Sequence, residues 1–353
     1  MVNLSSTNLI YVDESDCSCD SDYCSTASDS LSPSRQYFES DCFTEKDKTY
    51  KYDVLDKIGT GKFGTVVRYR DRLSNEHFAA KHIRIRKLNE RSMVEQEIAI
   101  MNRLNHRLIV QLHDVFFPAQ NRAVLVMELI EGGELFERIA DENYVVTEKA
   151  IVVFMRQICE AVSYIHSQDI IHLDLKPENI LCISRTGNRI KLIDFGLSHE
   201  YKPGDDIRIL AGTPEFAAPE IVNYERVEFT TDMWAVGVLA YILLSGLSPF
   251  LGDTDAETYC NITRGQWDFA EDEFADVSDD AKDFVKKLLK YDKSKRMTAD
   301  QCLFHRWLRR SDDADAQHLN NKQNLKHYLA RRRWRKGFHV VTAITRMGWK
   351  MKS

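Results

Sequence analysis

A polar run inside an apolar stretch constrains most strongly what this chain can fold into. The run reads HLDLKPEN over residues 172–179 and is flanked by apolar residues on both sides. Downstream, the apolar residues 190–193 predict a short strand that ends at Asp194-Phe195-Gly196, and Ala218-Pro219-Glu220 follows after a segment of loop length. Alone, each piece could be a turn, a capped helix start or a tight glycine turn. Together, in this order, they predict one functional unit.

A glycine-rich pattern lies upstream of that unit. Residues 51–57 alternate, the sequence GTGKFGTV follows over 59–66, and strand-like apolar character resumes up to residue 80. Three glycines let the backbone lie close over phosphates, and Lys81 on the following strand could reach them. An ordinary hairpin would look similar. A dinucleotide site would place a helix after the glycines, and here a strand follows.

A helix is predicted over residues 91–104, with Glu97 on the same face as its apolar stripe. Glu97 could be a solvated carboxylate. However, a lysine on a strand needs an anionic partner to hold it extended toward a nucleotide, so Glu97 is the candidate partner of Lys81. Residues 124–129 then predict a buried strand, and the break at 131–134 predicts a hinge between two lobes.

These motifs resemble the eukaryotic protein kinase family over residues 52–308. The resemblance implies an α+β, bilobal fold, with a small β-rich N-lobe over about 52–127 and a large helical C-lobe over about 131–308. ATP, with Mg²⁺, would bind in the cleft between the lobes.

The resemblance also implies roles in phosphoryl transfer. One carboxylate would accept the proton of the substrate hydroxyl, a lysine would lie beside the transferred group, and hard oxygen ligands would bind magnesium. The implied catalytic residues are Asp174, Lys176, Asn179, Lys81 and Glu97, and the implied metal ligands are Asn179 and Asp194.

The nucleotide site is implied in the same way. The glycine loop would cover the phosphates, apolar side chains would border the adenine, and the backbone from Glu128 to Ile130 would bind its edge, with Met127 as gatekeeper. The implied nucleotide-binding residues are Ile58, Gly59, Thr60, Gly61, Lys62, Phe63, Gly64, Thr65, Val66, Ala79, Lys81, Met127, Glu128, Ile130, Leu181 and Ile193.

Other positions would be structural or would bind the protein substrate. Glu220 would pair with Arg296, Asp232 would tie the backbone of the catalytic loop (residues 172–179), and Thr213 would select serine or threonine acceptors. Many kinases carry an arginine where this chain has Leu173, and that arginine receives an activation-loop phosphate. We therefore expect activity to be controlled elsewhere than between Gly196 and Ala218.

The two ends of the chain carry opposite charge, which the net charge of -6 conceals. Residues 1–48 hold ten Asp or Glu against three Lys or Arg and are rich in serine, so we expect a disordered leader. Three cysteines there, Cys17, Cys19 and Cys24, could suggest a metal, but no zinc-site spacing follows them. The other cysteines are expected to be reduced thiols, with Cys159, Cys182, Cys260 and Cys302 in the interior.

Residues 322–353 hold ten Lys or Arg and no acid. Trp334, Phe338, Val341 and Met347 take relative positions 1, 5, 8 and 14 of a predicted basic helix. Such a helix could be solvated, could lie on a membrane, or could bind calmodulin. Residues 330–334 resemble the calmodulin segment of myosin light-chain kinases, which implies calmodulin contacts by Arg331, Arg332, Arg333, Trp334, Phe338, Val341 and Met347.

The tail over 311–353 is thus predicted to be autoinhibitory as well as calmodulin-binding. Without calcium, residues 311–333 would pack on the lower lobe, with their basic side chains on Glu134 and Glu178, the acids nominated to bind substrate arginines. Calcium-loaded calmodulin would remove them.

The sequence therefore predicts a calcium/calmodulin-regulated serine/threonine kinase, with myosin regulatory light chain as substrate. A death-associated-type kinase with another substrate is an alternative, and so is a scaffold without catalysis, although Lys81, Asp174, Asn179 and Asp194 are intact. We expect a monomer without a nucleic-acid partner or transmembrane segment, cytoplasmic and associated with actomyosin; no run approaches the roughly 18 apolar residues of a membrane helix.

Overall fold

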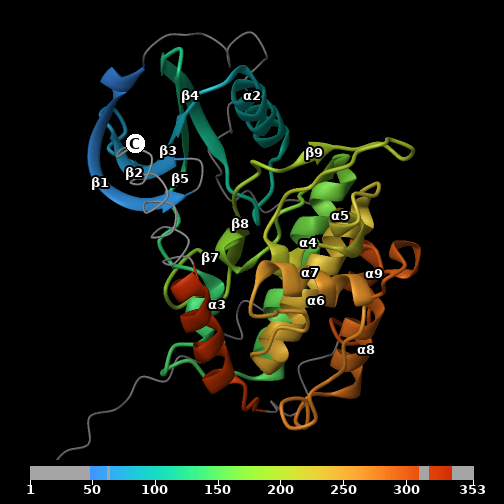
Figure 1. The fold of residues 1–353 in the computed structure, drawn as a ribbon. Coiled ribbons are helices and arrows are strands. Elements are labelled where there is room, and N and C mark those ends of the chain that lie inside the picture. Colours follow the sequence, from blue (N-terminus) through green and yellow to red (C-terminus); the bar gives the residue numbers. More distant parts are fainter. Residues whose placement is uncertain (1–47, 62–63, 310–317, 336–353) are drawn as a thin grey trace, which may run out of the picture.

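A five-stranded antiparallel sheet forms the N-lobe of the computed structural model, which describes residues 48–61, 64–309 and 318–335 (Figure 1). The strand order is β1-β2-β3-β5-β4. Lys81 lies in the central strand, opposite Val66 on one side and Leu125 on the other. The strands are β1 (Tyr52–Gly61), β2 (Gly64–Asp71), β3 (His77–Arg84), β4 (Leu112–Ala119) and β5 (Arg122–Glu128).

Helix α2 (Leu88–Arg103) lies beside this sheet (Figure 1). Its buried face includes Val94, Ile98 and Met101, and Glu97 is buried among them. The helix begins three residues before the predicted start. The apolar pattern does not reveal the first turn, because Leu88 is exposed and adds nothing to the buried stripe.

Aromatic side chains form a second small core in the N-lobe. Tyr52 stacks on Tyr69 at 5.4 Å and on Phe116 at 6.2 Å between ring centroids. Beneath them, the buried Asp114 accepts a hydrogen bond from Tyr52 Oη at 3.2 Å and pairs with Lys48 Nζ at 2.7 Å. Lys48 therefore belongs to the folded part, although the predicted leader includes it; residues 1–47 lie outside the described residues.

Helices dominate the C-lobe, as predicted. Helix α6 is buried along most of its length; it begins at a capping box between Glu228 and Thr231 and ends at Gly246, whose φ of 74° suits glycine. The helices are α3 (Leu135–Ile139), α4 (Glu148–Ser167), α5 (Pro219–Val222), α6 (Phe229–Ser245), α7 (Asp255–Arg264), α8 (Asp279–Leu288) and α9 (Ala299–Leu303).

Two pairs of short strands place the loops that carry the polar motifs. Strand β6 pairs with β9, and β7 pairs with β8, both antiparallel. Residues 172–179 therefore lie between β6 and β7, and Asp194 follows β8. The strands are β6 (Ile170–Ile171), β7 (Ile180–Cys182), β8 (Ile190–Leu192) and β9 (His199–Glu200).

A final described helix covers residues 322–335 and lies beside α3 on the lower lobe (Figure 1). Asn321, just before this helix, donates from Nδ2 to the backbone oxygens of Leu243 at 2.5 Å and Leu244 at 3.1 Å. Lys322 Nζ donates to Tyr144 O at 2.5 Å. Leu325 and Leu329 are buried against the lobe. The start of the helix is thus bound to the carbonyls at the end of α6.

The fold class predicted from the sequence is confirmed, with a sheet-based N-lobe and a helical C-lobe. Within the residues that the structure describes, no helix is long and apolar enough to cross a membrane. Cys159, Cys182, Cys260 and Cys302 are free thiols. The prediction that Cys260 is interior was wrong: it is exposed on α7, on the side of the helix away from the buried Thr258 and Ile262.

Candidate active site

Lys81 connects the two lobes at the centre of the candidate site. Its Nζ lies 2.6 Å from Glu97 Oε1 on α2 and 2.9 Å from Asp194 Oδ1 after β8. Burial alone would lower the pKa of Lys81, but the charges and hydrogen bonds of Glu97 and Asp194 outweigh burial and raise it. The ammonium therefore stays charged, and the predicted Lys81–Glu97 pair is present.

Asp194 is held ionised by the same contact. Burial raises its pKa, but the charge and hydrogen bond of Lys81, together with the charge of Lys176, lower it below the ordinary range. Asp194 also has a φ of 66°, in the left-handed region that non-glycine residues rarely adopt. Such strain gathers at functional sites, where the surrounding structure enforces it.

The loop over residues 172–179 brings three of the predicted catalytic side chains together. Lys176 Nζ donates to Asp174 Oδ2. Asn179 Nδ2 donates to the backbone oxygen of Asp174 at 2.8 Å and to its Oδ2 at 3.2 Å. Asp174 is buried, so these donors satisfy a carboxylate that would otherwise be costly to bury.

Asp232 fixes the backbone just before Asp174. Its two carboxylate oxygens accept the backbone N–H groups of His172 and Leu173, each at 2.8 Å, and His166 Nε2 lies 2.9 Å from Oδ2. Burial raises the pKa of Asp232, but the hydrogen bond and charge of His166, with the charge and backbone N–H of His172, lower it. The predicted tie between Asp232 and this loop is therefore present.

Asn179 and Asp194 fit the magnesium role implied for them. The contacts of the Asn179 side chain use its amide nitrogen, which leaves the amide oxygen as a hard donor. Within the described ranges, no three His, Cys, Asp or Glu side chains are arranged to hold a metal by themselves. Magnesium at phosphates needs only one or two protein ligands, because phosphate oxygens and water complete its shell.

The glycine hairpin joins β1 to β2. Gly59 pairs with Val66, Thr60 with Thr65, and Gly61 with Gly64. A Cβ on Gly64 would lie 1.8 Å from His82 O, so glycine is required there for β2 to approach β3. Lys62 and Phe63 at the tip lie outside the described residues.

The hinge follows β5. Met127 pairs with Ala79 on β3, which places both side chains at the inner end of the sheet. Glu128 uses its carboxylate locally: Oε1 lies 2.6 Å from Lys191 Nζ and accepts Gln111 N at 2.7 Å. The carboxylate of Glu128 is thus engaged within the protein, which leaves the predicted nucleotide contact at this residue to its backbone.

The remaining residues assigned to the nucleotide lie at the lobe boundary. Leu181 on β7 forms an isolated bridge with Glu134, and the backbone N–H of Ile193 donates to Asn179 O at 2.9 Å. Ile58 on β1 is 39% exposed. Exposure of an apolar residue at this edge leaves room for it to be covered by a ligand.

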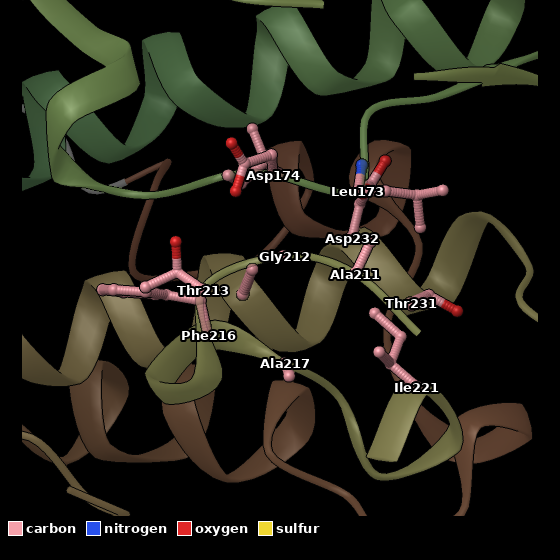
Figure 2. Close-up of a pocket in the computed structure, with 12 residues that line it drawn as sticks. Leu173, Asp174, Ala211, Gly212, Thr213, Phe216, Ala217, Ile221, Thr231 and Asp232 are labelled. Atoms are coloured by element: carbon pink, nitrogen blue, oxygen red, sulfur yellow. The ribbon is translucent and has the colours of Figure 1, made fainter. Parts of the chain in front are cut away.

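A pocket lies between the catalytic loop and the segment before α5, and Figure 2 shows Asp174 on one side of it and Thr213 on the other. Phe216 and Ala217, which follow Thr213 in the chain, also line it. The side chain with acid–base capacity and the hydroxyl predicted to select acceptors thus share one pocket.

The helix over residues 322–335 places an arginine next to this pocket. Arg332 pairs with Glu178, and its guanidinium lies 5.6 Å from the Phe216 ring centroid and 5.5 Å from that of Tyr328. Burial would lower the pKa of Arg332, but Tyr328, Glu178 and Glu215 raise it. The predicted contact of the tail with Glu178 is therefore present.

The neighbouring arginines bind acids that the sequence analysis did not single out. Arg331 lies 2.7 Å from Asp253, and Arg333 lies 2.6 Å from Glu137, while the charge of Glu134 also raises the pKa of Arg333. No local motif marks Glu137 or Asp253, because their role depends on how the helix packs.

Of the other predicted calmodulin residues, Trp334 is 69% exposed on the docked helix. Phe338, Val341 and Met347 lie outside the described residues.

The predicted structural pair is fully buried. Arg296 Nη1 lies 2.7 Å from Glu220 Oε1, and Nη2 lies 2.8 Å from Oε2, which is bidentate geometry. The guanidinium also lies 5.1 Å from the Trp234 ring centroid. This pair anchors the start of α5 to the loop before α9.

Comparison with known proteins places this geometry in context. A family model described as protein kinase domain matches residues 52–308. The chain is 50% identical over 302 residues to myosin light chain kinase 3 of Rattus norvegicus, covering 85% of this chain and 38% of that protein. It is 47% identical over 305 residues to smooth-muscle myosin light chain kinase of Gallus gallus, covering 86% and 16%. The chain thus spans less than half the length of these relatives.

Solved structures show the same arrangement. The twitchin kinase region from C. elegans superposes with a TM-score of 0.77 at 39% identity, covering 82% of this chain and 51% of that one. The autoinhibited serine kinase domain of the giant muscle protein titin gives a TM-score of 0.73 at 35% identity, covering 80% of this chain and 88% of that one.

Proposed function

This chain belongs to the protein kinase family, in the myosin light-chain kinase group, and from that premise we propose that it phosphorylates serine or threonine in myosin regulatory light chain under the control of calcium-loaded calmodulin. The observation that carries the proposal is the pair of ion pairs that Lys81 forms with Glu97 and Asp194. The loop that carries Asp174 and Asn179, which are hydrogen-bonded to each other, precedes Asp194 in the chain. These are the groups that phosphoryl transfer requires.

The chemistry follows from the positions of these groups. The hydroxyl oxygen of the substrate attacks the γ-phosphorus of ATP, and Asp174 accepts the hydroxyl proton. The bond from that phosphorus to the β-phosphate oxygen breaks. Lys176, already bonded to Asp174, neutralises charge on the transferred group. Lys81 binds the α- and β-phosphates, with Glu97 fixing its direction.

Magnesium supplies charge neutralisation at the phosphates when it is bound, and Asn179 and Asp194 are its protein ligands in this proposal. Thr213 selects a serine or threonine acceptor by its position across the pocket from Asp174 (Figure 2).

Regulation is proposed to act through the helix over residues 322–335. With Arg332 on Glu178 and beside Phe216, the helix occupies the approach that a basic substrate segment would use. Calmodulin, which is acidic, would take up the arginines together with Trp334 and so free Glu178. Two related kinases of solved structure, a twitchin kinase fragment and the titin kinase domain, are described as autoregulated and autoinhibited, which supports this regulation.

The protein partners proposed are calmodulin and a myosin light chain, which fit a location on actomyosin. The test is phosphate transfer from ATP to purified light chain, with calcium/calmodulin present or with calcium chelated. Transfer that requires calmodulin supports the proposal. Calmodulin-dependent transfer to basic peptides, but not to light chain, would keep the kinase and remove this substrate.

A further inference from the structure

The activation segment, defined here as residues 196–218, offers little to phosphorylate. Its hydroxyl side chains are Ser198, Tyr201 and Thr213. Ser198 and Tyr201 are buried, and Ser198 Oγ donates to His172 O at 3.2 Å. Thr213 lines the pocket beside Asp174. The segment must therefore be held in place by contacts other than those of a phosphate.

An apolar cluster surrounds Leu173, the position at which many kinases carry a phosphate-binding arginine. Leu173 is buried, and its backbone is strained at a φ of 63°. Ile207 and Ile209 of the activation segment pack against the cluster, while Asp206 and Arg208 between and beside them are exposed. This alternation is that of an extended strand with one face inward. The buried members of the cluster are Ile171, Leu173, Tyr201, Ala217, Ile221 and Val227.

Two polar contacts also hold residues 206 and 207 of the segment in this position. Val227 N donates to Ile207 O at 2.9 Å. Arg226 Nε lies 2.9 Å from Asp206 Oδ1, but both side chains are about half exposed. Exposed ion pairs contribute little, so the apolar contacts of Ile207 and Ile209 are the main attachment of residues 206–209.

Leu173 connects this attachment to the catalytic loop. It directly precedes Asp174, and its N–H is held by Asp232. On the segment side, Gly212 has a φ of 107°, and a Cβ there would lie 3.5 Å from Leu173 O. Figure 2 shows Leu173, Gly212 and Thr213 around one pocket. The activation segment therefore contacts the catalytic loop at this leucine.

We propose that Leu173 is a positioning residue, which holds residues 207–213 through the apolar cluster and so keeps Thr213 across the pocket from Asp174 without any phosphate on the segment. The inference rests on the proposed kinase function for its kinetic consequence. Its structural part, the attachment of the segment, can be measured separately.

The test uses the full chain with saturating calcium/calmodulin and compares Leu173→Ala with Leu173→Met, which restores apolar volume. We expect Leu173→Ala to raise the KM for a basic peptide by about tenfold and to leave the KM for ATP unchanged, because only peptide binding uses the segment. Tryptic cleavage after Arg208, followed by mass spectrometry, should accelerate by a similar factor. In Leu173→Met, the KM for the peptide and the rate of cleavage should both stay near the wild-type values.

Two further variants keep the test decisive. Ile209→Ala removes a half-buried side chain of the segment that packs against the cluster, and should act in the same direction even where Leu173→Ala does not fold. Leu73→Ala makes the same chemical change at a side chain that is 96% exposed, and should change neither value.

The inference would be overturned if folded Leu173→Ala and Ile209→Ala had the same KM for the peptide and the same rate of tryptic cleavage as the wild type. Absence of phosphate transfer by the wild type would instead refute the proposed function, and the cleavage rates would still decide whether Leu173 holds the segment.

Discussion

Arg332, from the last described helix, forms an ion pair with Glu178 of the catalytic loop. Glu178 lies directly before Asn179, whose side chain bonds to Asp174. The tail therefore reaches the loop that carries the proposed catalytic base, and the contact connects regulation to the site through adjacent residues of one short turn.

Removal of this arginine should loosen the tail. In Arg332→Ala, Glu178 loses its ion pair with Arg332, and the rings of Phe216 and Tyr328 lose the guanidinium. With calcium chelated, we expect activity to rise roughly tenfold, equivalent to about 1.4 kcal/mol, because the lost pair is largely buried, with side chains 11% and 17% exposed. Peptide phosphorylation without calmodulin measures this directly.

Lys326→Ala is the matched control for that experiment. Lys326 belongs to the same helix and pairs with Glu142 at 2.9 Å, but both side chains are solvent-exposed. A surface pair of this kind contributes little, so calcium-free activity should change less than twofold or so. Equal effects of the two substitutions would contradict a specific role for the Arg332–Glu178 pair.

The role of Glu97 can be tested without changing Lys81 itself. Glu97→Gln keeps the shape of the side chain but removes the anion 2.6 Å from Lys81. We expect kcat/KM for ATP to fall by about 10 to 100-fold, since Lys81 loses the group that directs it. Glu95→Gln, also on α2, removes only an i,i+4 pair with Arg91 and should leave kcat/KM near the wild-type value.

The buried pair between Glu220 and Arg296 should matter for stability. Glu220→Ala leaves a guanidinium in the interior without its carboxylate, which costs about 3–5 kcal/mol of unfolding free energy. Denaturant unfolding of the full chain measures the loss. Lys295→Ala, which breaks an exposed pair with Asp292, should cost less than about 1 kcal/mol. A Glu220→Ala midpoint equal to the wild-type value would show that the pair adds nothing.

Asp232 predicts how stability depends on acid. Its pKa in the folded protein is below the ordinary value of 3.8, so the unfolded chain binds a proton more readily than the folded chain. The stability that Asp232 contributes is therefore complete well above pH 3.8 and is lost as the pH falls below it. Thermal unfolding of wild type and Asp232→Asn should converge toward low pH. A constant difference from pH 7 to pH 3 would contradict this.

The catalytic part of the site could be predicted because its residues are close in sequence. Asp174, Lys176 and Asn179 fall within six positions, so the turn that follows Lys176 brings them together whatever surrounds it. Lys81 and Glu97 are separated by a loop, yet each belongs to a clearly patterned strand or helix.

The partners of the tail could not be predicted in the same way. Glu137 lies on a five-residue helix and Asp253 in a loop, and neither has a local pattern that marks a binding site. Which carboxylates meet Arg331 and Arg333 depends on the docking of the whole helix, which Asn321 fixes through the carbonyls at the end of α6. The environment of Leu173 is likewise formed by residues that lie far apart in the sequence.

The most direct test of the account is phosphate transfer from ATP to purified myosin regulatory light chain by the full chain, with and without calcium/calmodulin, beside Asp174→Asn. We predict transfer that requires calmodulin and is lost in Asp174→Asn, because the amide cannot accept the hydroxyl proton. Transfer of equal rate in Asp174→Asn, or no transfer by the wild type with calmodulin bound, would contradict the account.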